Sequence, residues 1–128
     1  MTQTRKRAAL PSSEHQLQSA LCTYLELMAR PEVLWFAIPN GGKRHIAVAV
    51  RLKKEGARRG VPDMAFCLPD GQTAWLELKI KGGSLSQEQR AFRDQVLFLG
   101  HRWGVAKTID EAIEYLTSVG ALRSQQGS

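Results

Sequence analysis

The sequence contains little cysteine: only Cys22 and Cys67 occur among its 128 residues. Both lie in apolar patterns, where a small buried thiol is the usual form, so we expect no disulfide framework. Neither cysteine nor any of the three histidines shows the close Cys/His spacing that a structural zinc site requires. The composition therefore argues against a small protein held together by disulfides or zinc.

Long apolar runs are also missing. The run at 46–50 is far too short to span a bilayer. The first residues are basic but have neither the apolar stretch nor the cleavage site of a secretory signal. We expect a soluble protein with no membrane partner and no nucleotide cofactor, located in the cytoplasm of a bacterial or phage-infected cell.

Acidic residues are outnumbered, with 12 Asp and Glu against 18 Lys and Arg, and the net charge is +6. Seven cations fall in one short stretch in which Glu55 is the only acid: Lys43, Arg44, Arg51, Lys53, Lys54, Arg58 and Arg59. Such a stretch is typical of a surface that binds phosphates, although it can also be a solvated helix face. It predicts a polyanionic partner, with each cation neutralising one phosphate.

The length fits one domain, which we place at 12–122, with 1–11 as a basic flexible arm and 123–128 as a disordered tail. Capping signals and periodicity predict helices that begin at Ser13, near His45, at Ser86 and at Thr108, the first ending near Arg30. Strands are predicted at 33–38, 63–68, 73–80 and 102–107, the first of them buried. The order αβαββαβα predicts an α/β fold in which helices flank a mixed central sheet.

The segment 69–71, Pro-Asp-Gly, predicts a tight hairpin between the two middle strands. If Gly71 adopts the left-handed conformation, the resulting register sets Asp63 across from Glu77. Because side chains alternate along a strand, Glu77 and Lys79 share one face. The hairpin is therefore expected to bring two carboxylates and a lysine together.

This combination of residues is suited to phosphodiester hydrolysis. Two adjacent acids repel each other unless a proton or a cation intervenes, and their hard oxygen atoms suit Mg²⁺ or Mn²⁺. A nearby lysine can orient the attacking water or balance charge on a phosphate. The alternative is structural: Glu77 and Lys79 form an ordinary exposed salt-bridge face, and Asp63 merely starts a strand.

In this order, the motifs resemble the VRR-NUC (virus-type replication-repair nuclease) branch of the PD-(D/E)xK nuclease superfamily, in its stand-alone form. The resemblance covers the chain from about Ser13 to Leu122 and implies a restriction-endonuclease-like sheet. The matching segments are Glu14 on the first helix, Asn40-Gly41-Gly42, Gly60-Val61-Pro62-Asp63, Glu77-Leu78-Lys79 and Leu85-Ser86-Gln87-Glu88-Gln89. No metal-binding position departs from the family pattern.

The resemblance implies that Asp63, Glu77 and the main-chain carbonyl of Leu78 bind Mg²⁺ or Mn²⁺ while Lys79 positions a water. It gives Glu14 and Gln89 supporting roles. Glu14 shares a helical face with Leu17, Leu21 and Leu25, so we expect its carboxylate to be buried toward the sheet; plain stabilisation of the helix N-terminus is the alternative. Gln89 can alternatively do no more than close a capping box with Ser86.

The implied activity is structure-directed endonuclease cleavage of branched DNA, such as a Holliday junction or a flap, in recombination, replication or repair. Symmetric cleavage of two strands requires a two-fold homodimer. The apolar run 46–50 is one candidate for the dimer surface, and burial in the monomer core explains it equally well. Two other functions stay open: a non-catalytic nucleic-acid-binding module, and a nuclease subunit that requires a partner chain for specificity.

Overall fold

The computed structural model describes residues 13–39 and 45–124. The basic arm, Asn40-Gly41-Gly42, Lys43, Arg44 and residues 125–128 of the tail lie outside the described residues. The elements follow in the predicted order and within about two residues of the predicted bounds: α1 (Glu14–Met28), β1 (Leu34–Ala37), α2 (Ile46–Lys54), β2 (Met64–Cys67), β3 (Thr73–Leu78), α3 (Gln87–Phe98), β4 (Arg102–Ala106) and α4 (Ile109–Ser118). The predicted α/β class is confirmed.

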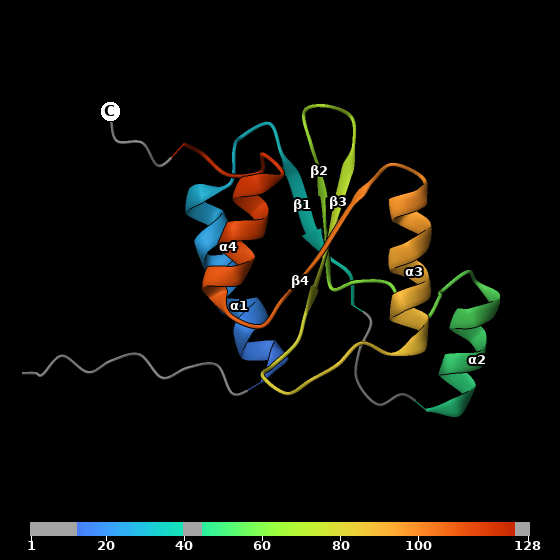
Figure 1. The fold of residues 1–128 in the computed structure, drawn as a ribbon. Coiled ribbons are helices and arrows are strands. Elements are labelled where there is room, and N and C mark those ends of the chain that lie inside the picture. The colour runs from blue at the N-terminus through green and yellow to red at the C-terminus, as the bar shows by residue number, and fades with distance from the viewer. Residues whose placement is uncertain (1–12, 40–44, 125–128) are drawn as a thin grey trace, which may run out of the picture.

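The four strands form one mixed sheet in the order β1-β2-β3-β4. The β1–β2 and β2–β3 pairs are antiparallel, and β4 pairs parallel with β3. A parallel pair needs a crossover connection, which α3 provides between β3 and β4. This connection sets the N-terminus of α3 at the end of the sheet where β3 finishes (Figure 1).

Helices cover both faces of the sheet. On one face, α1 and α4 lie side by side (Figure 1). Buried side chains there form the main core, including Leu17, Leu21, Leu25, Met64, Phe66, Leu76, Leu78 and Leu116. On the other face α3 packs against the sheet, where Phe92 meets Trp75 edge to face with 5.1 Å between ring centroids. Within the described ranges, no helix is long and apolar enough to cross a membrane.

The prediction that the first strand is buried is wrong. Strand β1 is an edge strand in which Leu34 and Phe36 are 63% and 44% exposed. The helices pack mainly on β3 and β4, so the outer half of the sheet is less covered. Aromatic and apolar residues favour a strand here, but they do not specify a covering layer.

Helix α2 is the least buried element. None of its residues is buried, and Ile46 and Val50 are 79% and 51% exposed. Burial of this run in the described monomer core is therefore ruled out. The expectation of buried thiols also fails, because Cys67 is exposed and Cys22 only half-buried; both are free.

Candidate active site

The hairpin between β2 and β3 has the register that the turn predicts. The Leu68 amide donates to the Gln72 carbonyl at 2.9 Å, and Gly71 has a φ of +86°, which a residue with a Cβ rarely adopts. Met64 pairs with Leu76, so one further step along the antiparallel ladder sets Asp63 opposite Glu77. The two acids therefore lie opposite each other because the turn at Gly71 sets the register of the whole hairpin.

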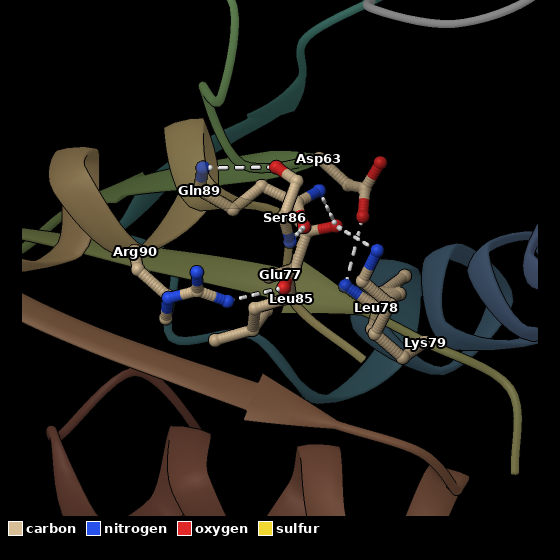
Figure 2. A network of polar contacts seen from close by, with 8 residues as sticks. All are labelled: Asp63, Glu77, Leu78, Lys79, Leu85, Ser86, Gln89 and Arg90. Carbon is tan, nitrogen blue, oxygen red and sulfur yellow. Dashed lines mark hydrogen bonds and ion pairs between the residues drawn. The ribbon is translucent and has the colours of Figure 1, made fainter. Parts of the chain in front are cut away.

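Asp63 is held by the main chain of the neighbouring strand. The Leu78 amide donates to Asp63 Oδ2 at 2.8 Å, and the Asp63 carbonyl accepts from the Ile38 amide, also at 2.8 Å. Figure 2 shows this carboxylate pointing toward the end of β3. The side chain is half-buried. Its carboxylate is held by the Leu78 amide and its main chain by the Ile38 amide.

Glu77 is the one charged residue in the buried set of the described chain, with 4% exposure. Its Oε2 accepts a hydrogen bond from Gln89 Nε2 at 2.9 Å. The Lys79 ammonium lies 3.8 Å from the same oxygen, and its side chain is largely buried as well (Figure 2). The structure thus brings Asp63, Glu77, Lys79 and Gln89 together.

The Glu77 carboxyl group binds its proton more tightly than an isolated carboxyl group does. Burial raises the pKa of Glu77 to about 8, with the negative charge of Asp63 as the next cause and Lys79 acting in the opposite direction. Burial also raises the pKa of Asp63, while the hydrogen bond from the Leu78 amide lowers it. At neutral pH the pair therefore favours retaining a proton, because the charge of Lys79 offsets only part of the effect of burial on Glu77.

These donors suit a hard divalent cation. Within the described residues, no three acidic, histidine or cysteine side chains are grouped closely enough to hold a metal ion by themselves. Asp63 and Glu77 would therefore need the Leu78 carbonyl and water to complete a coordination shell. Mg²⁺ commonly binds proteins in this way, through one or two carboxylates and several waters.

Glu14 lies near this pair but is not buried as expected. Its side chain is exposed, because Glu14 occupies the first turn of α1 beyond the buried positions that begin at Leu17. Glu14 nevertheless lines the same cleft as Asp63 and Glu77, and its charge contributes to raising both their pKa values. Its contact with the site is electrostatic.

Gln89 closes the capping box of α3 and also contacts Glu77, so the two alternatives left by the sequence do not exclude each other. Its Oε1 accepts from the Ser86 amide at 2.8 Å, and the Ser86 hydroxyl accepts from the Gln89 amide at 3.1 Å, which completes the capping box of α3. Its Nε2 is directed to Glu77. A side-chain amide can do this because it has an acceptor at one end and donors at the other.

Gly60 is a supporting residue whose packing role the sequence analysis did not identify. A Cβ at this position would lie 2.3 Å from the Glu88 carbonyl oxygen, and its φ is +85°. The chain just before Asp63 therefore rests directly on the first turn of α3. The sequence feature that could have indicated this packing is the glycine three residues before Asp63.

A broad cleft runs from these acids toward α2. Its lining includes Glu14, Asp63, Glu77 and Gln89, the cations Lys53, Arg58 and Arg59, and apolar residues such as Val50 and Leu52. Of the seven cations predicted to bind phosphate, these three line the cleft, whereas Arg51 and Lys54 are exposed on α2 outside it. The apolar wall contributed by α2 was not predicted.

No protein-family model and no curated protein matches this sequence. Two solved structures are similar to it at 18% identity over 82% of this chain: a "VRR_NUC domain protein", with a TM-score of 0.66 and 88% of its own length covered, and a "VRR_NUC domain", with 0.56 and 94%. The mixed four-stranded sheet with helices on both faces is an α/β fold that matches these structures. In particular, the chain has the VRR-NUC domain fold.

Metal-free protein should lose stability as the pH rises from about 5 to about 9. The pKa of Glu77 is about 8 in the folded chain against an ordinary value of 4.5, so between these values the folded state binds the extra proton and unfolding becomes easier as that proton is lost. Urea denaturation in EDTA across this range measures the slope. Glu77→Gln should flatten it, whereas Asp70→Asn, which alters an exposed acid in the hairpin turn, should not. Identical slopes in all three proteins would contradict the assignment.

Two substitutions of Gln89 should distinguish the contributions of its two side-chain hydrogen bonds to stability. Gln89→Glu keeps an acceptor for the Ser86 amide but sets a carboxylate against Glu77, so it should behave like wild type near pH 5 and lose stability more steeply toward pH 8. Gln89→Met removes both bonds and should cost about 1 kcal/mol or more across the range, as loss of a cap does. The measurement is the same urea series. Parallel pH profiles for Gln89→Glu and wild type would show that Glu77 does not sense this side chain.

Proposed function

We propose that this protein is a metal-dependent DNA endonuclease that hydrolyses phosphodiester bonds with Asp63, Glu77 and Lys79. The observation that carries the proposal is the burial of two interacting carboxyl groups beside a lysine, at one end of a cleft with cations on its wall. A purely structural salt bridge would not require a second acid facing the first. The fold is the nuclease-type fold of the two similar structures.

Asp63, Glu77 and the Leu78 carbonyl would hold Mg²⁺ or Mn²⁺, which would supply a Lewis acid to the phosphate and a more acidic bound water. Gln89 keeps the Glu77 carboxylate in one orientation through its 2.9 Å hydrogen bond. Glu14 adds negative potential at the mouth of the site, which favours a cation over a second proton. Gln89 and Glu14 would thus prepare the carboxylates for a divalent ion.

Lys79 lies on the same face as Glu77 and is held within ion-pair distance of it. As an ammonium group it cannot be a metal ligand, but it can orient a water for in-line attack on phosphorus and balance the charge that develops on the phosphate oxygens. The water oxygen forms the new bond to phosphorus while the ester oxygen opposite it leaves. Lys53, Arg58 and Arg59 would bind neighbouring phosphates.

The substrate that we propose is branched DNA, such as a Holliday junction or a flap formed in recombination, replication or repair. This part of the proposal rests on the resemblance of the sequence motifs to stand-alone VRR-NUC nucleases. The cations that line the cleft would contact phosphates, which carry no information on base sequence. Selection by DNA shape rather than by sequence follows from such contacts.

Cleavage of labelled four-way junction, flap and linear duplex DNA with Mg²⁺, Mn²⁺ or EDTA tests the function. Asp63→Asn, Glu77→Gln and Lys79→Met should each reduce metal-dependent cleavage by about 100-fold or more, because each removes a group that acts at the reacting atoms. Lys81→Met and Asp70→Asn are matched controls that lose the same charges at exposed positions and should stay active. DNA binding without cleavage under every condition would identify a binding module, and cleavage only with a co-encoded chain would identify a subunit.

We also propose that the protein is a homodimer and that α2 contributes to the interface. Ile46 and Val48 are exposed, apolar and absent from the cleft lining. Light scattering should give twice the chain mass of 14.2 kDa at micromolar concentration. Ile46→Glu or Val48→Glu should shift the protein toward monomer with an unchanged circular dichroism spectrum, whereas Leu27→Glu, at an exposed leucine on α1, should not. A monomeric wild type would contradict this proposal.

A further inference from the structure

Glu88 is an acid on the wall of the cleft that the proposed catalysis does not use. It lies in the first turn of α3 and lines the cleft next to Gln89. Its Oε2 is 3.9 Å from Nη1 of Arg59. Both side chains are largely exposed, at 49% and 87%, so the pair contributes little to the stability of the fold.

The main chain nevertheless fixes the two residues close to each other. Arg59 directly precedes Gly60, whose backbone lies so close to the Glu88 carbonyl that a Cβ there would be 2.3 Å from its oxygen. The pair is therefore set by a close contact of two backbone segments. It does not depend on the chance meeting of two long side chains.

Glu88 differs from the other acids of the cleft in the cation that compensates its charge. Glu14, Asp63 and Glu77 lie at the end where a divalent cation would compensate them. Glu88 instead faces Arg59, a cation that a DNA phosphate would need. Carboxylate and phosphate oxygens compete for the same guanidinium donors.

We propose that Glu88 occupies Arg59 in the absence of nucleic acid and that a DNA phosphate displaces it, so that Glu88 limits the affinity of the cleft for DNA. The inference rests on the proposed function. Only a DNA substrate that places a phosphate at Arg59 can displace Glu88 and bind this cation. The pair would therefore contribute to the selection among DNA substrates. An exposed contact of 3.9 Å is weak enough to be exchanged readily.

Glu88 also has a structural explanation, because an acid in the first turn stabilises a helix through its dipole. That role predicts a change in thermal stability when Glu88 is replaced and no change in DNA affinity. Binding measurements therefore distinguish the two roles. Asp94 on the same helix is a matched control, since it pairs with Arg93 at 2.9 Å and lies outside the cleft lining.

The test is fluorescence anisotropy of a labelled four-way junction with Mg²⁺, in a Lys79→Met background that blocks cleavage, over a range of NaCl concentrations. Glu88→Gln should bind several-fold more tightly, and the slope of log K against log salt should steepen by up to about one phosphate contact. Asp94→Asn should change affinity much less. Arg59→Gln should weaken binding and should cancel the gain from Glu88→Gln in the double variant.

Three results would overturn the inference: no gain with Glu88→Gln, an equal gain with Asp94→Asn, or a gain that persists without Arg59. The failure of the proposed function looks different. Cleavage that continues in the Lys79→Met background would reject the role proposed for Lys79 and leave this inference standing. A wild-type protein that neither cleaves nor binds DNA at any salt concentration would reject the nuclease assignment together with this inference. A thermal melt of each variant confirms that the affinities compare folded proteins.

Discussion

The burial of Asp63 against Glu77 is the constraint on which the site depends. A buried carboxylate loses its hydration, and a second one beside it adds repulsion, so the metal-free pair retains a proton at neutral pH. The surrounding donors offset part of this cost: the Leu78 amide for one acid, and Gln89 and Lys79 for the other. The fold thus stabilises an arrangement that is unfavourable on its own, which is a common feature of functional sites.

The first turn of α3 connects the two acids to the basic wall of the cleft. Gln89 completes the capping box of this turn and donates a hydrogen bond to Glu77. The Glu88 carbonyl packs against the backbone of Gly60. The segment that carries Arg59 and leads to Asp63 is therefore fixed to the helix that holds Glu77. The groups proposed for catalysis and for DNA binding therefore meet at one helix terminus, as positioning at a reacting centre would require.

Features that depend on neighbouring residues in the chain could be predicted from the sequence. The capped helix starts, the Gly71 turn and the register that opposes Asp63 to Glu77 all follow from local geometry. The exposure of β1, the uncovered face of α2 and the exposed position of Glu14 could not, because each depends on which distant element packs nearby. Periodicity shows that a face is apolar without showing what covers it.

Helix α2 links the two proposals about binding and assembly. A nine-residue helix with no buried residue has little stability of its own, since isolated helices of this length are marginal in water. Ile46 and Val48 are available to a partner chain, while Lys53 on the same helix lines the cleft. Any surface that covers the apolar residues would also fix Lys53 relative to Arg58 and Arg59. Dimer formation and phosphate binding would then stabilise the same helix, and each would favour the other.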